Sequence, residues 1–177
     1  MKYLALLRGI NVGGNRIIKM VDLKVAFEKS GFTDVTTFIQ SGNVVFSSDE
    51  KDTEKIARKL EDTVLQTFKI NSRIVVKSYS QLKKVLEEVP SEWKKENDLR
   101  CYLAFIKEPV SASDVLKEVA LKEGVDSAKA GEGVLYMTTK MSGLTQSGFT
   151  KLATKKIYKD LTIRNYNTSQ KLLALME

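Results

Sequence analysis

The sequence contains no histidine and a single cysteine, Cys101, among its 177 residues. Without these residues the usual Cys/His ligand sets for zinc and other transition metals are missing, so we expect no such metal site. One cysteine also excludes an intramolecular disulfide bond. The absence of histidine removes Ser-His-Asp and Cys-His machinery, so any catalysis must use carboxylates, lysine, tyrosine or a cofactor that the sequence does not identify.

Long hydrophobic runs are also missing from the start of the chain. Residues 3–7 form an apolar run of five residues that is closed by Arg8, which is too short for a signal peptide or a membrane span. We therefore expect a cytoplasmic protein without membrane contact. With only two prolines and ten glycines the chain has no composition for a long disordered tail, so nearly all of it should be ordered.

The net charge is +7 and comes mainly from lysine. A positive charge favours anionic partners, but it is equally typical of a soluble protein with a lysine-rich surface. Charge alone therefore does not assign a partner.

The first half of the chain has the pattern of a ferredoxin-like unit. Short runs rich in β-branched and aromatic residues predict strands, and apolar residues at helical spacing predict helices. Ser41-Gly42-Asn43 has the composition of a tight hairpin turn between two of the strands. The expected order is strand 3–8, helix 20–30, strands 35–40 and 44–47, helix 53–68 and strand 72–78, followed by a short helix 81–88.

The second half repeats this pattern at low identity. Residues 102–106 resemble 3–7, residues 131–136 resemble 41–46, and Ser169-Gln170 resembles Ser80-Gln81. The sequence thus predicts an α+β fold of two ferredoxin-like βαββαβ(α) halves related by internal duplication, with antiparallel sheets and helices on one face. We expect the first half at 1–90, a connection at 91–99 and the second half at 100–177.

The halves differ most after their first strands. The spacing of the repeat gives the first half about ten extra residues, in the loop from Arg8 to Arg16, where the second half has only 107–110. A scaffold does not require such a loop, so we suspect a function for it. In a ferredoxin-like sheet this loop, the hairpin at 41–43 and the start of the fourth strand near Asn71 and Arg73 should meet at one end.

Three segments resemble one known family. They are Leu7-Arg8-Gly9-Ile10-Asn11-Val12-Gly13-Gly14 followed by Met20, then Phe38-Ile39-Gln40-Ser41-Gly42-Asn43-Val44-Val45-Phe46, and the closing Thr162-Ile163-Arg164-Asn165-Tyr166-Asn167-Thr168. Together they resemble the bacterial family known as domain of unknown function 1697, whose members often have tryptophan where this chain has Tyr166. The resemblance implies a bacterial, cytoplasmic α+β protein and carries over no activity.

The loop from Arg8 to Arg16 is the best candidate for a binding site. Its glycines permit backbone conformations in which successive N–H groups point at one anion, and Arg8, Arg16, Asn11 and Asn15 add side-chain donors. The alternative is that Gly13-Gly14 merely turns the chain while the asparagines cap it. The predicted ligand-binding residues are Arg8, Asn11, Gly13, Gly14, Asn15, Ser41, Gly42, Asn43, Arg164 and Asn165.

Residues near the C-terminus receive separate interpretations. Asn167 or Thr168 is expected to cap the last helix, which leaves Arg164 and Asn165 as site candidates or as interdomain hydrogen-bonding groups. Four lysines, at 151, 155, 156 and 159, are expected on neighbouring turns of one helix, where they form a solvated face or contact a phosphate backbone.

Three functions of different classes follow from these patterns. The first is binding of a phosphate- or carboxylate-bearing small molecule, such as a nucleotide, at the loop end of the first half. The second is nucleic-acid binding through the lysines and the same loop, which is less favoured because the sheet lacks the aromatic RNA-recognition pattern. The third is an enzyme that works without histidine, for which no acid–base pair is evident. The sequence does not predict the oligomeric state.

Overall fold

The computed structural model describes residues 1–95 and 97–177. The chain divides into two compact units. The first unit comprises Met1–Lys83 and Lys171–Glu177, and the second comprises Lys84–Gln170. The predicted boundaries at 90 and 100 come from the sequence repeat rather than from contacts, and they stay a prediction.

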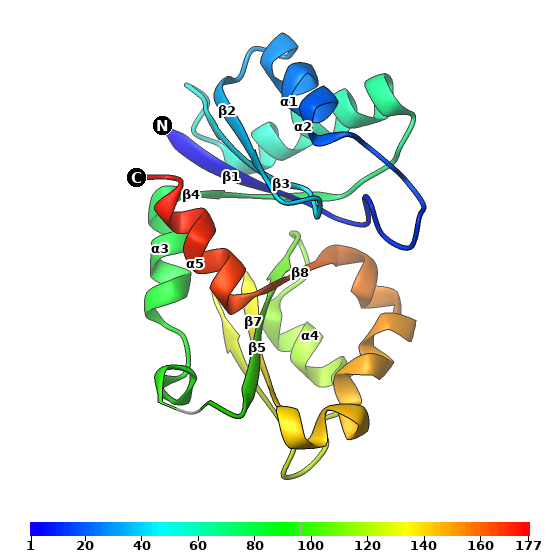
Figure 1. Ribbon diagram of the computed structural model, residues 1–177, viewed down its shortest axis with the longest axis vertical. Coiled ribbons are helices and arrows are strands. Elements are labelled where there is room, and N and C mark those ends of the chain that lie inside the picture. Colours follow the sequence, from blue (N-terminus) through cyan, green and yellow to red (C-terminus); the bar gives the residue numbers. More distant parts are fainter. Residues whose placement is uncertain (96) are drawn as a thin grey trace. The chain divides into compact units, whose positions relative to one another are not determined.

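The first unit is built around a four-stranded antiparallel sheet in the order β2-β3-β1-β4. Helices α1 and α2 lie on one face of this sheet (Figure 1). The order confirms the ferredoxin-like pattern predicted for the first half. Along the chain the elements are β1 (Lys2–Leu7), α1 (Met20–Lys29), β2 (Thr33–Phe38), β3 (Asn43–Ser47), α2 (Thr53–Phe68) and β4 (Ile74–Ser78).

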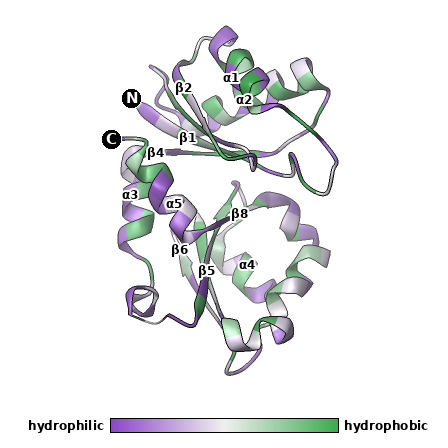
Figure 2. Ribbon diagram, in the orientation of Figure 1, coloured by the Kyte–Doolittle hydropathy of each residue, from purple (hydrophilic) through white to green (hydrophobic). Residues whose placement is uncertain are grey.

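Strand and helix periodicities explain the core of this unit. Alternate residues of β1, namely Tyr3, Ala5 and Leu7, join one buried cluster with the helices. In α2 the residues Ile56, Leu60 and Val64 recur every four positions and are buried. Figure 2 shows hydrophobic and hydrophilic residues alternating along α1 and α2, as expected for helices with one buried face.

The second unit contains an equivalent sheet in the order β6-β7-β5-β8. Where the first unit has α2, however, this unit has three short 3-10 helices. The prediction of one lysine-bearing helix here is therefore wrong, and Lys155 lies between two of the short helices. The elements are β5 (Leu99–Ile106), α4 (Ala112–Glu118), β6 (Asp126–Gly131), β7 (Val134–Lys140), η2 (Met141–Gln146), η3 (Gly148–Thr154), η4 (Lys156–Asp160) and β8 (Leu161–Asn165).

Strand register gives the correspondence between the halves. Leu7 pairs with Ile74 in the first sheet and Ile106 pairs with Leu161 in the second. The trailing helices α3 (Tyr79–Glu87) and α5 (Tyr166–Ala174) therefore start at equivalent residues. Ser80-Gln81 consequently corresponds to Asn167-Thr168, so the match to Ser169-Gln170 was wrong by two residues.

Each trailing helix begins in one unit and ends in the other. The end of α3 belongs to the second unit, where the Tyr136 hydroxyl donates to the backbone oxygen of Val85 at 2.9 Å. The connection that follows contains a 3-10 helix, η1 (Ser91–Lys94), whose buried Trp93 donates to the Thr138 hydroxyl. In the part of the chain that is described, no helix combines the length and apolarity needed to cross a membrane.

Candidate functional site

Three segments meet at one end of the first sheet. The Leu7 N–H donates to the Gly42 oxygen at 2.8 Å, which joins the end of β1 to the turn before β3. The Arg8 N–H donates to the Arg73 oxygen at 3.0 Å, and the Ser72 hydroxyl donates to the Arg8 oxygen at 2.8 Å. The loop after β1, the turn before β3 and the start of β4 therefore lie together.

The long loop after β1 folds as a small hairpin. Residues 8–19 separate β1 from α1, whereas residues 107–111 separate the equivalent β5 from α4. The Asn11 N–H donates to the Arg16 oxygen and the Asn15 N–H to the Val12 oxygen. Gly13 and Gly14 have φ values of 59° and 75°, as a two-residue type I′ turn requires. These glycines thus turn the chain, as the alternative interpretation expected.

The side chain of Asn11 joins this hairpin to its neighbours. Its oxygen accepts from the Ile18 N–H at 2.7 Å, and its nitrogen donates to the oxygens of Ile18 and Gln40 at 3.0 and 2.9 Å. Asn11 therefore holds the hairpin against the start of α1 and the turn before β3. Asn15, in contrast, donates a long bond of 3.4 Å to Gly13 in its own turn.

The turn before β3 is fixed by its own residues. Gly42 has a φ of +74°, and a Cβ there would lie 2.8 Å from the Cβ of Leu7, so the position requires glycine. The Asn43 side chain is buried and donates to the Phe38 oxygen and the Ser41 hydroxyl. The predicted site residues Gly42 and Asn43 therefore shape this end of the sheet.

Three arginines belong to the segments that meet at this end, Arg8 and Arg16 in the loop after β1 and Arg73 directly before β4. The Arg16 guanidinium donates to the Asn71 oxygen at 3.4 Å and lies beside Gly9. Arg8 and Arg73 are joined by the backbone hydrogen bond described above. Glu61 also reaches this end, where it accepts from the Ile74 N–H at 2.8 Å. Arginine side chains from separate segments give the end a basic character.

Backbone conformations in the left-handed region are concentrated here. One of them is Ile39, whose φ of 50° is unusual and costly for a β-branched residue. Such conformations persist where the surrounding structure enforces them, and they cluster at functional sites. The residues with positive φ at this end are Gly9, Asn11, Gly13, Gly14, Arg16, Ile39 and Gly42.

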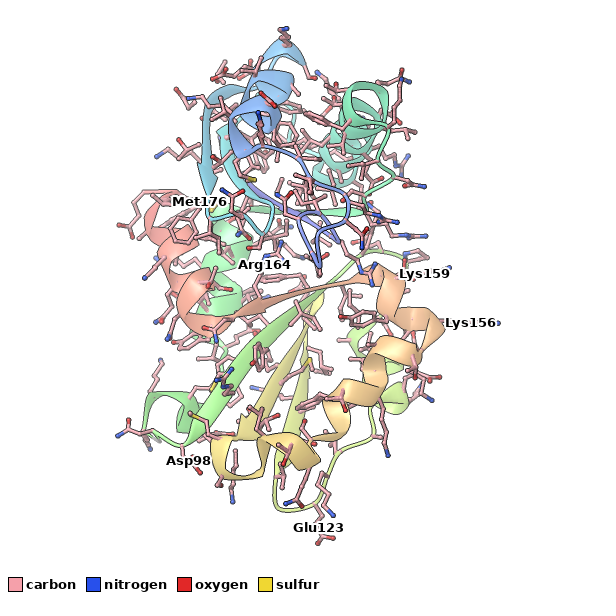
Figure 3. All side chains as sticks on the ribbon, turned by 45° about the vertical axis from the view of Figure 1, so that its right-hand side comes forward. Asp98, Glu123, Lys156, Lys159, Arg164 and Met176 are labelled. Atoms are coloured by element: carbon pink, nitrogen blue, oxygen red, sulfur yellow. The ribbon has the colours of Figure 1, made fainter. Side chains whose placement is uncertain are left out.

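The two remaining predicted site residues belong to the second unit. Arg164, in β8, is labelled in Figure 3, and burial lowers the pKa of its guanidinium to about 10. The Asn165 side chain accepts from the Asn167 N–H at 2.9 Å and so caps α5. The expectation that Asn167 or Thr168 is the cap was wrong, because the helix begins two residues earlier than expected.

The sequence pattern of one family covers most of the chain. The family is described as Protein of unknown function (DUF1697), and it matches residues 1–136. The chain belongs to this family. The matched part includes the hairpin, the turn before β3 and all three arginines of the loop end.

A solved structure with the same fold comes from Streptococcus pneumoniae. It is described as the conserved bacterial protein SP0830, and it superimposes with a TM-score of 0.86 at 24% sequence identity over 99% of this chain and 98% of that one. At this identity the likeness extends to the fold. No curated protein sequence matches the chain.

Sequence reasoning missed a network of hydrogen bonds around one carboxylate in the second unit. Asp126 accepts four hydrogen bonds, from the N–H groups of Lys122 and Gly148 and from the hydroxyls of Thr139 and Ser147. Burial acts to raise its pKa, but these hydrogen bonds outweigh it and hold the pKa below the usual range. Its partners come from separate segments, so no local spacing reveals them.

Other chemically interesting groups are less reactive than their residue types suggest. Burial and the charge of Glu92 raise the pKa of the Cys101 thiol to about 11, so the thiol stays protonated at neutral pH. Among the described residues, no group of three or more Cys, Asp or Glu side chains could hold a metal ion.

Proposed function

We propose that the loop end of the first unit binds a phosphate- or carboxylate-bearing small molecule, such as a nucleotide. The observation that supports this most directly is that Arg8 and Arg16 in the loop after β1 and Arg73 directly before β4 belong to segments that meet at this end. The planar guanidinium fork also matches phosphate and carboxylate oxygens better than an ammonium group does.

In this proposal the remaining predicted residues divide by role. Ser41, in the turn before β3, and Asn15, in the hairpin, supply polar groups at the same end. Asn11, Gly42 and Asn43 keep the three segments in place, and Gly13-Gly14 gives the hairpin its turn. Arg164 belongs to the second unit and stays a separate candidate for anion binding, whereas the Asn165 side chain is accounted for by the cap of α5.

Two other functions have weaker support. Nucleic-acid binding through the lysines of the second unit is weakened because Lys155 forms an ion pair with Glu118 at 3.3 Å. Lys156 and Lys159 point outward (Figure 3), as lysines of an ordinary solvated surface also do. For an enzyme, Asp126 is a carboxylate with four hydrogen bonds, and all four join it to backbone N–H groups or hydroxyls of its own unit. We propose that the protein acts as a cytoplasmic binding protein.

The Arg8→Ala variant tests this function. The hydrogen bonds of Arg8 to Arg73 and Ser72 use backbone atoms, which alanine keeps, so the free energy of unfolding should change by less than about 1 kcal/mol. A charge-assisted hydrogen bond contributes about 1.5–3 kcal/mol, so affinity for an anionic ligand should fall roughly tenfold or more. A thermal-shift screen of nucleotides, sugar phosphates and short oligonucleotides identifies the ligand, and calorimetry then measures its affinity for both proteins.

Arg58→Ala provides the matched control, because Arg58 is an exposed arginine of α2. It should leave affinity unchanged. The proposal is wrong if the identified ligand binds wild type and Arg8→Ala equally, if Arg8→Ala unfolds the protein, or if Arg58→Ala weakens binding as much.

A further inference from the structure

Four exposed aliphatic residues are sequence neighbours of Asn11 or of the residues that its side chain contacts. Its amide contacts Ile18 and Gln40, and the sulfur of Met20 lies 3.9 Å from its nitrogen. Each of these residues, and Asn11 itself, has one aliphatic neighbour in sequence that faces solvent. These neighbours are Val12, Ile17, Val21 and Ile39, with exposed fractions of 65%, 69%, 72% and 51%.

The four side chains, which we name the aliphatic surface, lie on firmly held backbone. The hairpin hydrogen bonds fix Val12, the Asn11–Ile18 pair of bonds fixes Ile17, and the first turn of α1 carries Val21. Ile39 is held in a left-handed conformation that disfavours a β-branched residue. Exposed apolar groups on a preformed surface indicate an interaction site, because solubility alone would select polar residues there.

Cations lie along the same stretch of chain. Residues 8–21 contain Arg8, Arg16 and Lys19 and no acidic residue. A partner that complements this surface must combine apolar side chains with negative charge. The four aliphatic residues are valine and isoleucine, whereas single-stranded nucleic acids are bound by stacking on aromatic rings. They also come from the hairpin, the segment before α1, the first turn of α1 and the turn before β3, and not from one amphipathic helix of the kind that lies in a bilayer surface.

We propose that the aliphatic surface docks an acidic segment of another protein in which apolar residues alternate with Asp or Glu. The apolar residues contact Val12, Ile17, Val21 and Ile39, and the carboxylates pair with Arg8, Arg16 and Lys19. This inference relies on the proposed function only for the basic character of the loop end, and it adds a surface that a small anion does not need.

The test uses a fluorescently labelled peptide of twelve residues with alternating Leu and Glu, measured by fluorescence anisotropy. Wild type should bind it at least ten times more tightly than a Leu/Lys peptide or a Ser/Glu peptide. The Val12→Ser/Ile17→Ser double variant should bind it at least ten times more weakly than wild type, and Leu121→Ser, which changes an exposed leucine of the second unit, should bind as wild type does. Circular dichroism should show both variants folded.

Several outcomes overturn the proposal. The proposal is wrong if the Leu/Glu peptide binds wild type and the double variant equally, or does not bind wild type. It is also wrong if wild type binds phosphatidylserine vesicles or single-stranded DNA more tightly than the peptide and the double variant loses that binding. Failure of the proposed function can be told apart from failure of this inference, because the affinity for a nucleotide or sugar phosphate should fall in Arg8→Ala and stay unchanged in Val12→Ser/Ile17→Ser.

Discussion

One side-chain amide, that of Asn11, joins the hairpin to the start of α1 and to the turn before β3 at the loop end of the first unit. It makes three hydrogen bonds to backbone groups of Ile18 and Gln40, and its own φ is 55°. Asparagine tolerates this left-handed conformation better than most residues do. The residue therefore contributes both through its amide and through its backbone.

We expect Asn11→Ala to lower the free energy of unfolding by about 2–3 kcal/mol, because it removes these hydrogen bonds and places alanine at a positive φ. Asn15→Ala removes one long bond and should cost less than about 0.5 kcal/mol. Urea denaturation of both variants measures the difference. If the two variants lose similar amounts of unfolding free energy, Asn11 does not join these segments as its hydrogen bonds indicate.

At the scale of elements, Asp126 organises the part of the second unit that replaces a helix. Its carboxylate receives N–H groups from Lys122 and from Gly148 at the start of η3, and a hydroxyl from Thr139 in β7. Gly148 must remain glycine, since a Cβ there would overlap the backbone oxygen of Ala120. The 3-10 segments are thus tied to the sheet through a side chain of β6.

Asp126→Asn should destabilise the protein by about 2 kcal/mol at pH 7, because an amide NH2 group would face donors that now meet a carboxylate oxygen. The folded-state pKa of Asp126 is lowered, so its stabilising effect is present above the unfolded-state pKa of about 3.9 and is lost as pH falls further. Denaturation of wild type and variant at pH 7 and near pH 2.5 should therefore show that the difference between their free energies of unfolding is smaller in acid. The exposed Asp62→Asn is the control, and a difference that does not change with pH would contradict the assignment.

Element boundaries show what the sequence could and could not predict. Runs of β-branched and aromatic residues predicted the strands of the first half, and four-residue spacing predicted α2, because burial of one face dominates their energetics. Residues 151–159 were misread because four lysines at helical spacing do not distinguish an α-helix from short 3-10 turns. The cap of α5 was misplaced since Asn165, Asn167 and Thr168 are all capable of capping. The Asp126 network depends on long-range contacts that no local pattern encodes.

At the scale of the whole molecule, the C-terminal residues belong to the first unit although they follow the second half of the repeat. Met176 is buried, whereas its neighbour Leu175 is 40% exposed. The last turn of the chain therefore contributes to a core formed mainly by residues far away in sequence.

We expect Met176→Ala to lower the free energy of unfolding by about 2–3 kcal/mol, as is typical of a buried methionine, and Leu175→Ala to cost less than about 1 kcal/mol. Hydrogen exchange measured by mass spectrometry should show the loss of protection within residues 1–83. Loss confined to residues 84–170 would contradict the division of the chain.

The trailing helices that begin in one unit and end in the other bear on the ancestry of the chain. A single ancestral half would have carried a helix whose end had no place within its own unit. Two such halves would form a symmetric homodimer in which the last turns of each trailing helix pack in the other subunit. Fusion of two gene copies would then have turned an exchange between subunits into one within a polypeptide, after which the two loop ends were free to diverge, one of them acquiring the arginine-bearing hairpin.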